Sequence, residues 1–248
     1  MSEPACFVLV HGAWQGSWVW QRVAERLRTQ GHRVEIPSLT GLGERAHLAG
    51  PEIDLETHIA DVMGAIEHHE LDKIVLVGHS YGGMVVTGAA DRLPERIRSL
   101  VFLDAFIPSD GKSMFDLQPP EVAERQRAEA ELGGEGWRIH PLSASYFRIA
   151  DPGDIARIDR CAVDQPIGTM AQKTRLSGAW EKISHLAYIR AAGHSRGPFG
   201  QFAERVRGNE AWQYFEIPCG HNVMLDMPDA LTGILIECAA QAARRPIR

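Results

Sequence analysis

The sequence lacks the features of membrane proteins and of nucleic-acid-binding proteins. None of its 248 residues belongs to an apolar run approaching the ~18 residues of a membrane span. Acidic residues (32) outnumber lysines and arginines (26), and the net charge of −6 argues against a nucleic-acid partner and gives no reason to expect an anionic membrane partner. The opening segment Met1–Pro4 shows neither the basic nor the apolar region of a secretory signal. We therefore expect a cytoplasmic protein, whose oligomeric state the sequence leaves open.

Cysteine is also scarce, and nothing in the sequence predicts a metal centre. The four cysteines form no CxxC pair and no metal-ligand spacing. The adjacent histidines His68 and His69 end a helical pattern, and no third ligand accompanies them in the sequence. These residues predict buried thiols and a solvated helix end rather than a bound metal ion.

What the chain does have is a regular alternation of strand and helix patterns, which predicts a mostly parallel sheet flanked by helices. Apolar, β-branched runs predict strands at Phe7–Val10, Arg33–Ile36, Lys73–Val77, Leu100–Leu103, Leu186–Ile189 and Trp212–Ile217. Helical spacing predicts helices at Trp18–Arg28 (with Ser17 as N-cap), Glu56–Glu70, Val85–Ala90, Phe199–Arg207 and Asp229–Ala243.

The alternation stops in the middle of the chain. Between residues 108 and 180, prolines and glycines interrupt the pattern, and the one sustained helix candidate is Glu121–Leu132. A length of 248 residues suits one large domain with a small insertion. We therefore predict an α/β core from residues 1–107 and 181–248, with residues 108–180 inserted as a cap.

The seven-residue segment Gly78–Met84 is the most informative part of the chain. It lies between the apolar run Lys73–Val77 and the small apolar segment Val85–Ala90, so the pattern predicts a strand, a tight turn and a helix. A serine between glycines at such a turn is a nucleophile elbow, G-x-S-x-G. Side chains on the two glycines would collide with the neighbouring backbone. Ser80 is therefore expected in a strained conformation that exposes its hydroxyl.

A serine hydroxyl is a poor nucleophile at neutral pH and needs a base within hydrogen-bond reach. His221 follows the last predicted strand, on a loop that can place it over the carboxyl edge of the sheet, where Ser80 is expected. The alternative is a histidine on a surface loop. Together with the elbow, this position predicts His221 as the general base.

The acid that would orient His221 is absent from its usual place. The chain order serine, acid, histidine puts the acid after the strand Leu186–Ile189, yet residues 182–203 contain no Asp or Glu. Asp104 directly follows the preceding strand, Leu100–Leu103, and a carboxylate there could still reach the imidazole. We therefore predict Asp104 as the acid. Two weaker alternatives, expected to be surface or capping residues, are Asp110 and Asp226.

An oxyanion hole needs two backbone N–H groups aimed at the point where negative charge develops. The amide of Tyr81 is one candidate, because it follows the nucleophile at the positive end of a helix. The amide of Ala13 is the other, in the turn after the first strand, where Gly12 allows the chain to bend.

With these residues assembled, the chain resembles an α/β-hydrolase over essentially its whole length. Within that fold it is similar to the branch that holds the plant methyl esterases and hydroxynitrile lyases. The resembling segments are Phe7–Trp14, Pro37–Glu44 and the elbow. The resemblance implies cofactor-free chemistry, a cap over the active site and a Ser–His–Asp triad.

The chain departs from that branch in two places. The plant enzymes have their acid after the later strand, whereas Asp104 resembles the placement in haloalkane dehalogenases, whose aspartate-nucleophile chemistry Ser80 excludes. Hydroxynitrile lyases of the branch have a threonine at the position of Gly12 and a lysine directly after the histidine, where this chain has Asn222. Cyanohydrin cleavage thereby loses its main support.

These observations predict a serine carboxylesterase that hydrolyses a small or aromatic, uncharged ester or lactone through an acyl-enzyme. Carbon–carbon bond hydrolysis, perhydrolysis and, with less support, hydroxynitrile lyase activity are alternative reactions of the same residues, and a small-ligand receptor is the non-catalytic alternative. Aromatic candidates for the substrate pocket include Trp14, Tyr81, Phe106, Trp137, Tyr146 and Trp180.

Overall fold

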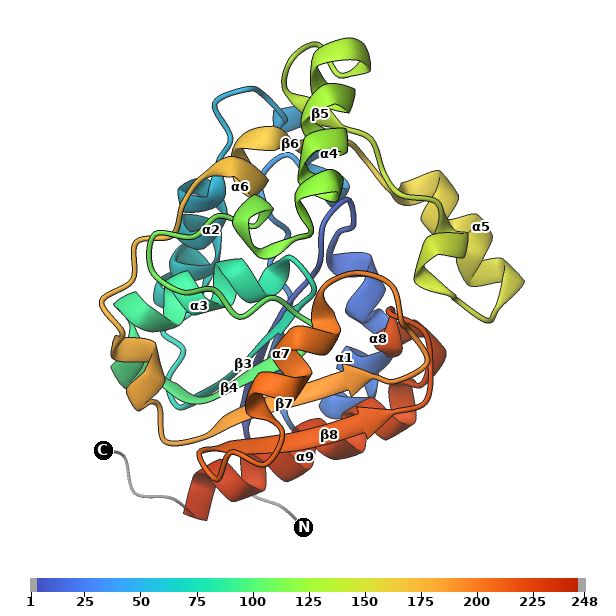
Figure 1. The fold of residues 1–248 in the computed structure, drawn as a ribbon. Coiled ribbons are helices and arrows are strands. Elements are labelled where there is room, and N and C mark those ends of the chain that lie inside the picture. Colours follow the sequence, from blue (N-terminus) through green and yellow to red (C-terminus); the bar gives the residue numbers. More distant parts are fainter. Residues whose placement is uncertain (1–3, 245–248) are drawn as a thin grey trace.

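Six parallel strands form the central sheet of the structure, a computed structural model that describes residues 4–244. Their order across the sheet is β2–β1–β3–β4–β7–β8 (Figure 1). The strands are β1 (Cys6–Val10), β2 (Arg33–Glu35), β3 (Ile74–His79), β4 (Ile97–Leu103), β7 (Leu186–Ala191) and β8 (Trp212–Ile217). The predicted α/β class and its mostly parallel sheet are confirmed. Each predicted strand is present: Trp212–Ile217 has the predicted bounds, and the other five have slightly different ends.

Helices cover both faces of this sheet. α1 (Gln21–Thr29) packs against α9 (Pro228–Arg244), and α2 (Leu55–His68) packs against α3 (Gly82–Arg92). Figure 1 shows the two pairs on opposite sides of the strands. The strands β1, β3 and β4 are almost entirely buried, because a parallel sheet covered on both faces exposes neither.

The start of the first helix differs from the prediction. Residues Ser17–Trp20 form a 3₁₀ turn, η1, before α1 begins, and its N-cap is Gly16. The prediction of Ser17 as N-cap is therefore wrong: Ser17 lies inside the turn, and its hydroxyl lies 3.4 Å from the carboxylate oxygens of Glu44. By contrast, Asp54 caps α2 by accepting a hydrogen bond from the Thr57 amide at 2.9 Å.

In the segment between β4 and β7, the elements α4, β5, β6 and α6 lie at the top of Figure 1, and α5 lies at its right. The two short strands of this segment pair antiparallel with each other, apart from the central sheet. It contains the expected helix α4 and also α5, a helix of ten residues that the sequence pattern did not predict. The elements are η4 (Phe115–Leu117), α4 (Pro120–Gly133), β5 (Arg138–Ile139), η5 (Ala144–Phe147), α5 (Pro152–Cys161), β6 (Gln165–Pro166), α6 (Ile167–Ala171) and η6 (Ala179–Lys182). The boundaries 108 and 180 stay predictions.

The remaining helices after β7 are α7 (Phe199–Val206) and α8 (Val223–Asp226). Within residues 4–244, no helix combines the length and the apolar character that crossing a bilayer requires.

Candidate active site at the carboxyl edge of the sheet

The turn between β3 and α3 has the geometry expected of a nucleophile elbow. A Cβ on Gly78 would lie 2.7 Å from the carbonyl oxygen of Gly82, and a Cβ on Gly82 would lie 2.7 Å from the carbonyl oxygen of His11. Ser80, between them, has a φ of 54°, in the left-handed region. The predicted crowding at both glycines and the strained backbone at Ser80 are therefore confirmed.

Backbone hydrogen bonds hold this elbow against the end of β4. The amide of Ser80 donates to the carbonyl of Leu103 at 3.2 Å, and the amide of Phe106 donates to the carbonyl of Ser80 at 3.2 Å. The two neighbouring strand ends, and the residues that follow them, are thereby fixed relative to each other.

Asp104 and His221 meet beside this elbow. Asp104 directly follows β4, has a φ of 41° and is fully buried, and its Oδ2 lies 2.6 Å from Nδ1 of His221. His221 lies in the loop between β8 and α8. The two alternative acids have other partners: Asp110 accepts from the Leu176 amide at 2.8 Å, and Asp226 accepts from the Ala150 amide at 3.2 Å.

The same carboxylate has a second partner that the sequence analysis did not find. Arg190, the penultimate residue of β7, donates one hydrogen bond to Oδ1 of Asp104 and another to the carbonyl of His194. The amide of Ala191 also donates to Oδ1, at 3.3 Å. Burial raises the pKa of Asp104, and the Arg190 guanidinium opposes that rise.

Aromatic rings and backbone contacts fix His221 in its place. Its ring stacks with those of Phe147 and Phe199, at centroid distances of 5.6 and 4.7 Å. Its amide donates to the carbonyl of Phe147 at 2.9 Å, and its carbonyl lies 3.0 Å from Nε2 of His79. Burial, with a smaller effect of the Arg190 charge, lowers the pKa of His221 to about 3.

A cavity of about 120 Å³ brings the candidate residues together. Ser80, His221 and Ala13 line it, along with three of the predicted aromatic residues, Trp14, Phe106 and Tyr146. Its other walls come mainly from α4, η5 and the segment before α7: Met114, Gln118, Pro119, Val122, Arg125, Gln126, Leu142, Phe147, Gly197, Pro198 and Phe199.

Three predicted aromatic side chains lie elsewhere. The Trp180 ring packs against Phe102 and Trp212, and η6, which contains it, contacts α3. The Trp137 ring lies under the guanidinium of Arg138. The Tyr81 hydroxyl lies 2.8 Å from Nδ1 of His58 in the core. None of these three residues lines the cavity at Ser80, so their contact with substrate stays a prediction from the sequence.

The two predicted oxyanion donors are free to bind a ligand. Within residues 4–244, neither the Ala13 amide nor the Tyr81 amide donates to a protein acceptor. The next residue, Trp14, has a φ of 63°, and its amide donates to Oε1 of Gln165 at 3.0 Å. Its indole donates to the carbonyl of Ile139, also at 3.0 Å. The turn beside Ala13 is therefore fixed by residues of the segment between β4 and β7.

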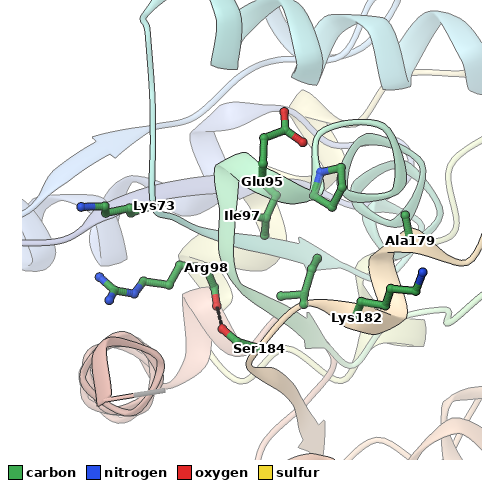
Figure 2. Close-up of a pocket in the computed structure, with 9 residues that line it drawn as sticks. Lys73, Glu95, Ile97, Arg98, Ala179, Lys182 and Ser184 are labelled. Carbon is green, nitrogen blue, oxygen red and sulfur yellow. Dashed lines mark hydrogen bonds between the residues drawn. The ribbon is translucent and has the colours of Figure 1, made fainter. Parts of the chain in front are cut away.

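A larger pocket, of about 350 Å³, lies at the opposite edge of the sheet. Lys73 and Ile97, at the amino ends of β3 and β4, contribute to it. Figure 2 shows Lys73 and Arg98 on one side of the pocket and Lys182 on the other, so the three cations do not converge on one point. In the described range 4–244, no group of three or more His, Cys, Asp or Glu side chains is arranged to hold a metal ion. Ligands of open α/β sheets bind at the carboxyl ends of the strands, which favours the cavity at Ser80.

The chain belongs to the α/β hydrolase family, whose model matches residues 7–233. It is 45% identical over 235 residues to a "Carbendazim hydrolyzing esterase" from Nocardioides sp., covering 92% of this chain and 96% of the relative. It is 33% identical over 145 residues to "Methylesterase 9" of Arabidopsis thaliana, covering 57% of each chain.

A solved structure has the same fold. An extracellular α/β-hydrolase from a Paenibacillus species, whose described homology is to tobacco salicylic acid binding protein 2, superposes with a TM-score of 0.83 at 24% identity. The match covers 95% of this chain and 99% of that one. The resemblance to the plant methyl esterase branch is confirmed by these relatives.

Proposed function

We propose that the protein is a serine carboxylesterase that hydrolyses a small or aromatic, uncharged ester or lactone through an acyl-enzyme. The observation that carries the proposal is the 2.6 Å contact between Asp104 and His221, beside a cavity that both His221 and Ser80 line. The esterases among its relatives support the same reaction class. Cofactor-free chemistry and a cytoplasmic location stay predictions from the sequence.

The proposed mechanism assigns one role to each group. Nδ1 of His221 donates to Asp104, which leaves Nε2 as the basic nitrogen that takes the Ser80 proton. Ser80 Oγ attacks the ester carbonyl, and the free amides of Ala13 and Tyr81 stabilise the oxyanion. His221 returns its proton to the leaving alcohol, and water activated by the same imidazole then releases the acid from Ser80.

The size and lining of the cavity support a small substrate. Its volume of about 120 Å³ is below the roughly 300–1,000 Å³ of pockets that hold drug-sized ligands. Aromatic and aliphatic side chains dominate the lining, and Arg125, Gln118 and Gln126 are its polar members on the side of α4. Such walls favour a compact, largely apolar ester.

The name of the Nocardioides relative suggests one compound to test. Carbendazim is an aromatic methyl carbamate, so its hydrolysis would use the same acyl transfer from an alkoxy leaving group to Ser80. A lyase reaction has less support, because Asn222, directly after His221, is fully buried and supplies no cation for a leaving cyanide. Carbon–carbon hydrolysis and perhydrolysis are the alternatives that the experiment must separate.

The test compares the unaltered protein with Ser80→Ala and with Ser145→Ala, a matched change on the exposed surface. The substrates are p-nitrophenyl acetate, butyrate and octanoate, carbendazim, a vinylogous diketone and, with added peroxide, acetate. We expect hydrolysis of the short esters by the unaltered protein and by Ser145→Ala, and none by Ser80→Ala. Turnover that survives in Ser80→Ala would exclude Ser80 as nucleophile. Turnover of the diketone alone would replace the esterase assignment with carbon–carbon bond hydrolysis.

A further inference from the structure

Arg190 places a buried cation against the acid of the proposed triad. Its side chain is only 12% exposed, and it contacts Oδ1 of Asp104, whereas His221 contacts Oδ2. Its second hydrogen bond, to the carbonyl of His194, fixes the guanidinium between two separate segments of the chain. The carboxylate of Asp104 is thus held from both sides.

The surroundings of Asp104 explain why such a cation is needed. A neutral His221 does not balance the charge of a fully buried carboxylate, and an unpaired buried charge is strongly unfavourable. The acid follows the end of β4, and the neighbouring parallel strand β7 supplies Arg190. This arrangement places a carboxylate beside His221 and a positive charge behind it.

Other titratable rings share this buried site. The rings of His79 and His194 lie 4.5 and 5.0 Å from that of His221. Burial is the largest cause of a lowered pKa at each of the three, and it brings the pKa of His194 to about 4. The charged and titratable groups that face this cluster are Asp104 from the end of β4, His79 from β3, Arg190 from β7, His194 from the following loop, Tyr146 and Arg148 from η5 and its end, and His11 from the end of β1.

We propose that Arg190 is a positioning residue for the triad: it holds Asp104 against His221 and offsets the carboxylate charge, so that the His221 imidazole stays unprotonated, and able to accept the Ser80 proton, in acid solution. This inference rests on the proposed serine esterase function. Arg190 is not among the residues that line the cavity at Ser80, so it acts through Asp104. Without its charge, Asp104 would attract a proton onto His221 at a higher pH, which would block proton transfer from Ser80.

Two substitutions separate the charge of Arg190 from its hydrogen bonds. Arg190→Gln keeps a donor for Asp104 but removes the charge, whereas Arg190→Lys keeps the charge but loses the planar fork. The readout is the acid limb of kcat/KM against pH, which reports the protonation of the free enzyme's base. We expect Arg190→Gln to move that limb up by about one to two pH units, and Arg190→Lys to leave it near its original position. Arg207→Gln, which removes a surface ion pair with Glu216, is the matched control.

An acid limb that is unchanged in Arg190→Gln, with kcat lowered equally at every pH, would show a purely structural role and overturn the proposal. If Arg190→Gln does not fold, the unaltered protein can still overturn the proposal, because burial and the Arg190 charge together require its acid limb to lie clearly below the ordinary histidine pKa of about 6.5. A limb at or above that value would contradict the proposal.

A second readout does not depend on turnover. NMR titration of the His221 ring in Ser80→Ala protein, with and without Arg190→Gln, should show the same upward shift of the imidazole pKa. If the imidazole pKa shifts in this titration but the protein with Ser80 intact has no esterase activity, the role of Arg190 stands and the proposed function is rejected. If the protein with Ser80 intact is active but the pKa does not shift, the proposed function stands and the role of Arg190 is rejected.

Discussion

The backbone amide of Trp14 donates a hydrogen bond to the side-chain oxygen of Gln165, at 3.0 Å and across 151 residues of sequence. Gln165 is fully buried and in turn donates from Nε2 to the hydroxyl of Thr169 at 2.6 Å. Because Trp14 directly follows Ala13, this bond links β6 to the proposed oxyanion hole. The segment between β4 and β7 therefore both walls the cavity and fixes one side of the turn that carries the proposed oxyanion donor Ala13.

Gln165→Leu should weaken catalysis through this turn. The change leaves the buried Trp14 amide without an acceptor, at a cost of about 1–3 kcal/mol, and allows the Ala13 amide to move. We expect kcat to fall about 10- to 100-fold with KM little changed, since the loss is confined to the transition state. Steady-state kinetics on a short p-nitrophenyl ester measure this split.

Gln172→Leu is the matched control for that variant. Gln172 follows α6 in the same segment and binds Asp54 and the amide of Glu56, at the start of α2. It should lower the melting temperature without lowering kcat. Equal kcat losses in the two glutamine variants would mean that general loosening of the segment, rather than the Trp14 contact, affects catalysis.

Asp104→Asn tests the assignment of the acid. The amide can still contact His221, but it favours the wrong tautomer and no longer stabilises the imidazolium, so kcat should fall about 10⁴-fold. Asp226→Asn should change kcat little, because Asp226 instead accepts a hydrogen bond from the Ala150 amide. The reverse ranking of the two variants would remove Asp104 from the triad.

The sequence was sufficient for those parts of the site that depend on local order. The elbow requires small residues at Gly78 and Gly82, the proposed acid Asp104 directly follows β4, and the proposed base His221 lies in the loop after β8, so neighbouring residues indicate all three positions. Arg190 and Gln165 act on residues 86 and 151 positions away, and no local pattern indicates such partners. Trp180 shows a second limit of the sequence analysis. Its ring packs on Phe102 of β4, and composition alone does not distinguish an aromatic residue packed in the core from one that lines a pocket.

Two helix glycines, Gly83 directly after the elbow in α3 and Gly64 in α2, give stability predictions of opposite sign. A Cβ on Gly83 would lie 2.1 Å from the carbonyl oxygen of Phe106, whereas nothing lies within 4 Å of a Cβ on the exposed Gly64 in α2. Gly83→Ala should therefore cost about 3 kcal/mol of unfolding free energy through overpacking. Gly64→Ala should add about 1 kcal/mol, because alanine favours the helix. Urea denaturation measures both, and a stable Gly83→Ala variant would contradict the close approach of α3 to the Phe106 turn.

Buried neutral histidines make stability depend on pH with a definite sign. Burial lowers the pKa of His11, His58 and His194 to about 4, whereas an unfolded histidine has a pKa of about 6.5. Between these values the unfolded chain binds protons that the folded chain does not, so the unfolding free energy must fall as the pH falls. Each such group contributes about 1.4 kcal/mol per pH unit over that window.

His194→Phe isolates one of these contributions. Neither ring nitrogen of His194 has a hydrogen-bond partner within residues 4–244, so the substitution removes a titratable group without breaking a bond of its side chain. At pH 7.5 the difference in unfolding free energy from the unaltered protein reflects packing alone. At pH 5.0 the same difference in unfolding free energy should shift by about 2 kcal/mol in favour of the variant, because the variant binds one proton fewer on unfolding. Urea denaturation at both pH values gives the comparison. An identical difference at the two values would mean that His194 is protonated in the folded protein, and a stabilising interaction with Asp104 would then have to replace the repulsion from Arg190.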